Sequence, residues 1–159
     1  MIRKGSTIFR LNGSIRLNGD DMKYCGMELK GSEALIAIVE KDEAGLHYVE
    51  SQNKRIALTD DESQAAVKLF QEAIAAFLRT NQISIVAIKK RNKKGEFSSG
   101  AVSFKIEGLL QVNPVCEVRL IAAPTIAASH RRNNFPTPPK LNKYQLDAYL
   151  TACCCAEAS

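Results

Sequence analysis

Two stretches of this sequence contain residues that could do chemistry. The apolar segment 24–29 carries one carboxylate, Glu28, shortly before a turn at Gly31. A carboxylate in this position can help to hold a divalent cation such as Mg²⁺ if other oxygen ligands come to meet it. The second stretch is a basic run, and its charged side chains suit the phosphates of a nucleic-acid backbone. Its basic residues are Lys89, Lys90, Arg91, Lys93 and Lys94.

The composition is that of an ordinary globular protein. The chain has 159 residues, of which 45% are hydrophobic and 25% charged, enough for one domain with its own core. It has neither an apolar run of membrane-spanning length nor the apolar region of a signal peptide. Its five cysteines lack the regular spacing of a disulfide framework or a zinc site. We therefore expect a cytoplasmic protein with no membrane partner, in which Cys153, Cys154 and Cys155 pack a C-terminal helix.

Charge is unevenly distributed along the chain. The net charge is +5, but residues 22–82 hold 7 basic and 10 acidic side chains, whereas residues 83–159 hold 11 and 5. A basic half favours an anionic partner, and nucleic acid is the commonest one. A solvated basic surface without a partner is the alternative interpretation.

Residues 1–21 differ from the rest of the chain. The pair Asn12-Gly13 lies between two short alternating segments, which predicts a hairpin with a type I′ turn. Two strands alone are only marginally stable in water. We therefore expect residues 1–21 to be an extension outside the core, and the domain to comprise residues 22–159.

From Met22 onward, strand patterns come first and then alternate with helix patterns. Three strands near residues 23–27, 34–39 and 46–50 predict an antiparallel meander, and a further extended piece is expected at 54–58. Two more strands are expected at 83–88 and 115–121. This order predicts an α/β fold with a mixed sheet flanked by helices.

The helices have recognisable starts and buried faces. Thr59 or Asp60 is expected to cap the first helix. Its apolar stripe is Val67, Phe70, Ile74 and Phe77. Residues 101–112 suit either a strand or a helix, residues 124–128 a short helix, and residues 131–141 a loop. Asn142 and Gln145 predict a capping box before the last helix. The expected buried stripe of that helix is Leu146, Tyr149, Leu150 and Cys153.

This order of elements, with two short motifs, resembles the ribonuclease H-like superfamily over about residues 22–155. The motif Gly26-Met27-Glu28-Leu29-Lys30-Gly31 resembles its first-strand motif, in which an acid precedes a turn. The segment 146–152, with Asp147 before Ala148, resembles the final helix of the RuvC-like Holliday-junction resolvases. The chain is also similar to a small uncharacterised bacterial family of this fold. The resemblance implies a mixed five-stranded sheet, a three-strand antiparallel meander followed by parallel strands.

The resemblance also implies a site. Nucleases of this fold are expected to hold two divalent ions between carboxylates, one ion activating water and the other stabilising the leaving oxygen. The resemblance assigns Glu28 and Asp147 to catalysis and metal binding. It places Lys89 where the resolvase branch has a third acid. The ammonium group of Lys89 would then pair with the two acids instead of a metal, which implies an altered or lost nuclease site. An alternative recruits a third acid from Glu33, Glu107 or Asp61, to which no motif points.

Each of these residues also has a simpler interpretation. Glu28 could be an exposed acid at a strand end, Asp147 an acid that the helix dipole favours, and Lys89 a solvated loop lysine. If the site is real, the basic run should lie beside it. Arg131 and Arg132 would extend that basic surface by the same fold argument.

We therefore predict a nucleic-acid-binding ribonuclease H-like domain with a degenerate or altered nuclease site. One alternative is an active endonuclease of the resolvase kind, with Mg²⁺ or Mn²⁺ as its cofactor. The other is a protein-interaction module that keeps only the scaffold, since fold alone does not fix function. The resolvase branch forms dimers, so the resemblance also implies a homodimer.

Overall fold

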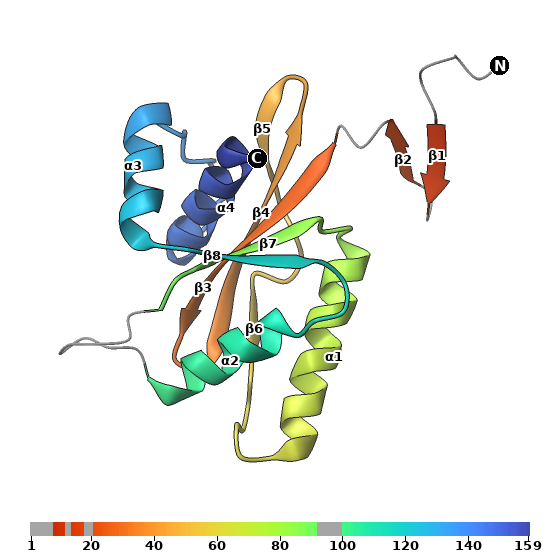
Figure 1. Cartoon of the computed structure of the whole chain (residues 1–159), viewed down its shortest axis with the longest axis vertical. Coiled ribbons are helices and arrows are strands. Elements are labelled where there is room, and N and C mark those ends of the chain that lie inside the picture. Colours follow the sequence, from red (N-terminus) through yellow and green to blue (C-terminus); the bar gives the residue numbers. More distant parts are fainter. Residues whose placement is uncertain (1–7, 12–13, 18–20, 92–99) are drawn as a thin grey trace.

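The computed structural model describes residues 8–11, 14–17, 21–91 and 100–159, and its centre is a six-stranded sheet (Figure 1). Its strands are β3 (Met22–Lys30), β4 (Glu33–Asp42), β5 (Gly45–Val49), β6 (Arg55–Ala57), β7 (Ile85–Lys89) and β8 (Glu117–Ile121). The order is β5-β4-β3-β7-β8, with β6 beside β4. β4 is antiparallel to β3 and β5, while β7 and β8 run parallel to β3. The predicted meander and parallel strands are confirmed, and β6 adds a sixth strand to the expected five.

Helices cover both faces of this sheet (Figure 1). α1 (Gln64–Thr80) and α2 (Ala101–Gln111) pack on one face. α4 (Leu146–Ala158) packs on the other, with α3 (Ala123–Asn133) beside it. Side chains alternate between the two faces along a strand. In β3, Cys25, Met27 and Leu29 therefore join the core under α1 and α2, while Tyr24 joins the core under α4.

α4 lies directly on β3 because Gly26 has no side chain. A Cβ added at Gly26 would stand 1.8 Å from the carbonyl oxygen of Ala148 and 2.8 Å from the nitrogen of Ala152. Both neighbours are backbone atoms that cannot turn aside. Glycine at this strand position lets the helix approach the sheet, and this approach brings the start of α4 close to the end of β3.

α1 starts later than the sequence indicated. It begins at Gln64, and its cap is Ser63, whose Oγ accepts a hydrogen bond of 3.2 Å from the nitrogen of Ala66. The expected cap, Thr59 or Asp60, was wrong, because Asp60 instead accepts a bond from the nitrogen of Glu62 in the preceding turn. The expected apolar stripe is confirmed, with Val67 partly buried. Its fully buried members are Phe70, Ile74 and Phe77.

Two other segments are more helical than expected. Residues 101–111 form α2, with Ile106 and Leu110 buried, which settles the ambiguity in favour of a helix. α3 continues to Asn133, so the predicted loop start at residue 131 was wrong. Asn134 ends that helix in the left-handed conformation, with φ 50°, which asparagine tolerates better than most residues.

α4 begins after the predicted capping box and is buried on most of its surface. The Asn142–Gln145 box is present on a short 3₁₀ turn (Lys143–Gln145) that leads into the helix. Leu146 is 37% exposed, so its place in the predicted stripe was wrong. The sheet and α3 together cover the helix, which also buries Thr151 and the small residues between the stripe positions. The three consecutive cysteines are buried and free, as a packing role requires.

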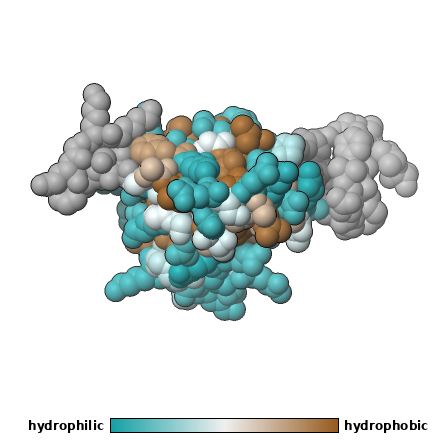
Figure 2. All heavy atoms as spheres, turned by 90° about the horizontal axis from the view of Figure 1, so that it is seen from below, coloured by the Kyte–Doolittle hydropathy of each residue, from teal (hydrophilic) through white to brown (hydrophobic). Residues whose placement is uncertain are grey.

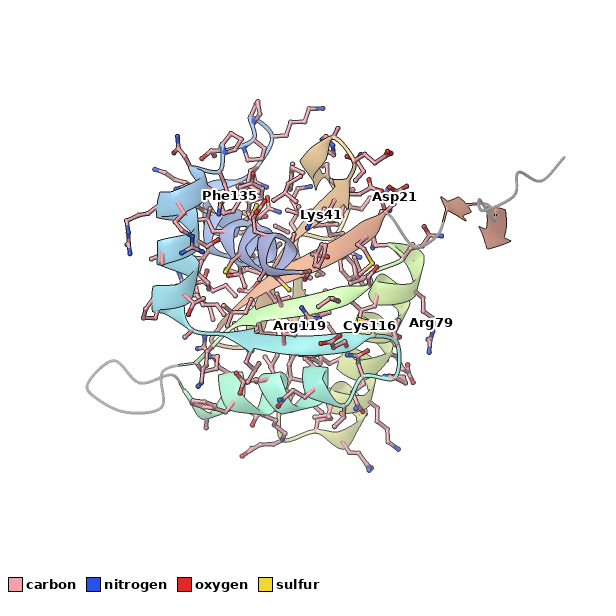
Figure 3. The ribbon with its side chains drawn as sticks, turned by 45° about the horizontal axis from the view of Figure 1, so that its top comes forward. Asp21, Lys41, Arg79, Cys116, Arg119 and Phe135 are labelled. Carbon is pink, nitrogen blue, oxygen red and sulfur yellow. The ribbon has the colours of Figure 1, made fainter. Side chains whose placement is uncertain are left out.

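The far end of α4 is held by two basic side chains. Lys41 of β4 donates a bond of 2.9 Å to the carbonyl oxygen of Ala156, and Arg119 of β8 donates one of 3.2 Å to Oγ of Ser159. Figure 3 shows both side chains on the sheet beside the helix. Cations at this position suit the negative end of the helix dipole.

β1 (Ile8–Leu11) and β2 (Ser14–Leu17) form an antiparallel pair with its own two-stranded sheet. The predicted turn at residues 12–13 lies outside the described residues. Figure 2 shows a face on which hydrophilic side chains surround scattered hydrophobic ones.

Within the described ranges, no helix is both long and apolar enough to cross a membrane.

Candidate functional site

Strand register and helix packing bring three predicted site residues together. Met27 of β3 pairs with Ile88 of β7 in parallel register, so the next residues, Glu28 and Lys89, are neighbours. Both extend to the face that α4 covers, where Asp147 occupies the first turn of the helix.

The start of α4 is fixed in place by Gln145. This side chain is 1% exposed, and its Nε2 donates a hydrogen bond of 2.8 Å to the carbonyl oxygen of Ile36 in β4. Its Oε1 accepts a bond of 2.9 Å from the nitrogen of Asn142. The capping box thus ties the helix to the sheet as well as ending the loop, and Asp147 lies two residues further along the chain.

Lys89 lies between two acids. Its Nζ donates a hydrogen bond of 2.8 Å to Oδ2 of Asp147 and lies 4.0 Å from Oε2 of Glu28. We call these three residues the carboxylate–lysine cluster. The Glu28 side chain is only 12% exposed. Lys89 is the last residue of strand β7, and its ammonium group has two acidic neighbours. The simpler interpretations of these two, as an exposed acid and a solvated loop lysine, were therefore wrong.

The pKa values of the two carboxyl groups are shifted in opposite directions. Burial raises the pKa of Glu28, and the charge of Asp147 and a hydrogen bond between the carboxyls raise it further, against the opposing effect of Lys89. Burial would also raise the pKa of Asp147, but the hydrogen bond and charge of Lys89, with the bond to Glu28, outweigh it and lower that pKa. The first proton taken up by this coupled pair therefore goes to Glu28.

Two pockets flank Lys89, and both have Lys89 and Ala123 in their walls. The first, of ≈ 500 Å³, is lined by Glu28, three further basic residues and the start of α3. Those basic residues are Lys30, Lys90 and Arg91. The second, of ≈ 420 Å³, lies between α3 and α4. Its polar lining is Lys89, His130, Arg131 and Asp147.

The predicted basic residues are only partly gathered at this site. Lys89, Lys90 and Arg91 line the first pocket, and Arg131 lines the second. Arg132 is exposed on the last turn of α3. Lys93 and Lys94 lie outside the described residues.

The alternative third acids have other surroundings. Glu33 pairs with Arg55 at 3.3 Å, and Asp61 lies 4.0 Å from Nζ of Lys105. Glu107 is 8% exposed on α2, the helix of the opposite face. In the portion of the chain that the structure describes, no three acidic, histidine or cysteine side chains are grouped so that they could hold a metal ion.

Several residues of the site were missed by sequence reasoning. Gln145 was predicted as a cap, but its bond to β4 depends on tertiary structure. Gly26 had a signal, since glycine inside a strand often marks a close backbone approach. His130, to which no sequence motif points, stacks on Phe135, with ring centroids 6.0 Å apart, and lines the second pocket.

The sheet order and the helices on its two faces are those of the ribonuclease H-like fold. The structure is similar to the Thermus thermophilus RuvC structure, with a TM-score of 0.64 and 11% identity over 85% of this chain and 93% of that one. It is also similar to T. thermophilus RuvC in complex with a Holliday junction substrate, with a TM-score of 0.59, 11% identity, and coverages of 85% and 92%. At such identities the likeness establishes the fold, which confirms the expected fold class.

The chain belongs to the family described as "Protein of unknown function (DUF3010)", which matches residues 22–155. No curated protein matches the sequence.

Proposed function

We propose that this protein is a nucleic-acid-binding domain in which a lysine takes the place of a catalytic metal ion. The observation that carries this proposal is the position of Lys89 Nζ, 2.8 Å from Asp147 and 4.0 Å from Glu28. The single positive charge of an ammonium group there offsets one of the two carboxylate charges, whereas a divalent ion would offset both.

A lysine at this position cannot do the same chemistry as a divalent metal ion. A divalent ion lowers the pKa of bound water and stabilises a leaving oxygen, and a two-ion site needs several oxygen ligands. A lysine ammonium offers three hydrogen-bond donors but cannot activate water in this way. The lysine thus offsets part of the acidic charge of the cluster, while the basic residues around it keep the surrounding surface positive.

A basic surface around the carboxylate–lysine cluster attracts phosphates. Its described members are Lys89, Lys90, Arg91, Arg131 and Arg132, and the proposal also includes Lys93 and Lys94, which lie outside the described residues. Contacts of this kind bind the nucleic-acid backbone without reading sequence. That the similar T. thermophilus RuvC was solved with a Holliday junction substrate supports nucleic acid as the ligand class.

Fluorescence anisotropy with labelled duplex DNA, four-way junction DNA, single-stranded DNA and RNA over a series of salt concentrations tests the proposal. We expect binding that weakens with salt. Arg131→Gln should weaken it and reduce the salt slope by roughly one. Arg79→Gln is the matched control, because Arg79 is exposed on α1, well away from α3 (Figure 3). No salt-dependent binding to any of these nucleic acids would contradict the proposal and favour the protein-interaction alternative.

Cleavage separates the proposal from the nuclease alternative. The same labelled nucleic acids are incubated with the full chain and either Mg²⁺ or Mn²⁺. We expect the nucleic acids to stay intact. Cleavage that requires Glu28 and Asp147 would show an active metal site instead.

A further inference from the structure

We propose that the first pocket, between the ends of β3 and β7 and the start of α3, is a phosphate subsite that holds one phosphate group on Lys30, Lys90 and Arg91. We call it the β3–α3 pocket. The inference rests on the proposed function, because it names the place where one phosphate of the nucleic acid lies. The chemistry recognised is a phosphate group, whether it belongs to a phosphodiester backbone or to a small phosphorylated molecule.

Basic residues outnumber acidic ones in the lining of the β3–α3 pocket, although Glu107 on α2 also acts on Arg91. Glu28 is its acidic lining residue, against Lys30, Lys89, Lys90 and Arg91. Lys89 is already hydrogen bonded to Asp147. Lys30 acts electrostatically on Glu28 and Asp147, but within the described ranges neither Lys30 nor Lys90 forms an ion pair, so both ammonium groups can turn to a ligand. A concave site with one sign of charge concentrates the field that draws in an anion.

Arg91 lines the β3–α3 pocket with a guanidinium group. Its Nε is buried and has no hydrogen-bond partner in the described parts of the chain. Buried polar groups are nearly always hydrogen bonded, so such a donor calls for an explanation. The charge of Glu107 on α2, whose Oε2 is likewise buried without a hydrogen-bond partner, acts on Arg91 from outside the pocket. A phosphate would be bound by the part of the Arg91 guanidinium group that lines the β3–α3 pocket, and such a group binds phosphate with favourable geometry.

The start of α3 adds to the preference for an anion. Residues 122–124 line the pocket, and the first turn of this 11-residue helix has neither an acidic residue nor a side-chain cap. The positive end of the helix dipole therefore faces the pocket without an internal counter-charge. A volume of ≈ 500 Å³ has room for a phosphate group with part of the molecule that carries it.

NMR titration of the full chain with inorganic phosphate, and separately with a short oligonucleotide, tests this subsite. We expect both ligands to shift the backbone amide signals of Leu29, Arg91 and Ala123. Arg91→Gln and Lys30→Gln should each weaken binding of the oligonucleotide, Arg91→Gln by about tenfold. Arg79→Gln and Lys68→Gln, which remove the same charges from exposed positions on α1, should have little effect.

The outcomes separate this inference from the proposed function. If the oligonucleotide binds both pocket variants as tightly as the parent, the subsite is overturned while nucleic-acid binding stands. If phosphate shifts the pocket signals but no nucleic acid binds, the subsite stands, its ligand is a small phosphorylated molecule, and the proposed function falls. If neither ligand shifts these signals in the parent chain, the subsite is overturned even where a variant fails to fold.

Discussion

Nζ of Lys89 donates a hydrogen bond of 2.8 Å to Oδ2 of Asp147, although 58 residues separate them in the chain. The bond joins the end of β7 to the first turn of α4, beside the end of β3. It therefore links the elements that form the site.

Neutralising the two acids one at a time should change stability in opposite directions. Because the pKa of Glu28 is raised in the folded protein, its ionised form destabilises the fold at neutral pH, and Glu28→Gln should raise the free energy of unfolding. Because the pKa of Asp147 is lowered, its charge stabilises the fold, and Asp147→Asn should lower that free energy. Both effects should be at most about 1 kcal/mol for such partly exposed groups.

The pH dependence checks these signs. The gain from Glu28→Gln should be full above the folded pKa of Glu28 and vanish below the ordinary value near pH 4, where the acid is neutral in both states. The loss from Asp147→Asn should be present above about pH 4 and vanish as pH falls through the lowered pKa of Asp147. Urea unfolding at a series of pH values measures both. Equal signs at pH 7 would contradict the described charge balance.

A methyl group at Gly26 should disrupt the packing of α4. In Gly26→Ala, the new Cβ would overlap the backbone of Ala148 and Ala152, so the helix must move away from β3. We expect a loss of about 3 kcal/mol or more in the free energy of unfolding. Gly108→Ala is the matched control, because Gly108 is inside α2 with nothing within 4 Å of its added Cβ, and it should be neutral or stabilising. Similar unfolding midpoints for the two variants would show that α4 does not approach β3 so closely.

Deletion of residues 1–21 should leave the core intact. β1 and β2 pair with each other, and in the described part of the chain neither pairs with a strand of the main sheet. We expect the thermal midpoint of the 22–159 chain to be nearly unchanged by circular dichroism. A drop of many degrees would mean that the first 21 residues belong to the core.

Most of the fold could be predicted because its signals are local. The apolar run in β4, the stripe on α1 and the capping box before α4 are each written in a few neighbouring residues. The start of α1 could not be placed as well, because Thr59, Asp60 and Ser63 are all good caps and packing chooses between them. The length of α3 was also missed, because basic and polar residues near Asn133 resemble a loop in sequence.

In the candidate site, too, residues with a local sequence signal could be predicted, whereas contacts between distant segments could not. Glu28 and Asp147 could be predicted to lie near each other because each stands in a short motif, one near the end of β3 and the other at the start of α4. The bond of Gln145 to Ile36 and the pocket position of His130 depend on contacts between distant segments. Such contacts leave no periodic or local pattern in the sequence.

The central claim is that Lys89 occupies the place of a metal ion, and a melting curve of Lys89→Glu with and without Mn²⁺ tests it most directly. This substitution places three carboxylates together without the ammonium group that now lies between two of them, and their repulsion should lower the thermal midpoint in the presence of a chelator. Mn²⁺ should restore the lost stability, because an ion that binds only the folded state stabilises it. Lys90→Glu, with the same charge change at the next residue, should show no such rescue. A Lys89→Glu protein that is as stable as its parent and indifferent to Mn²⁺ would contradict the account.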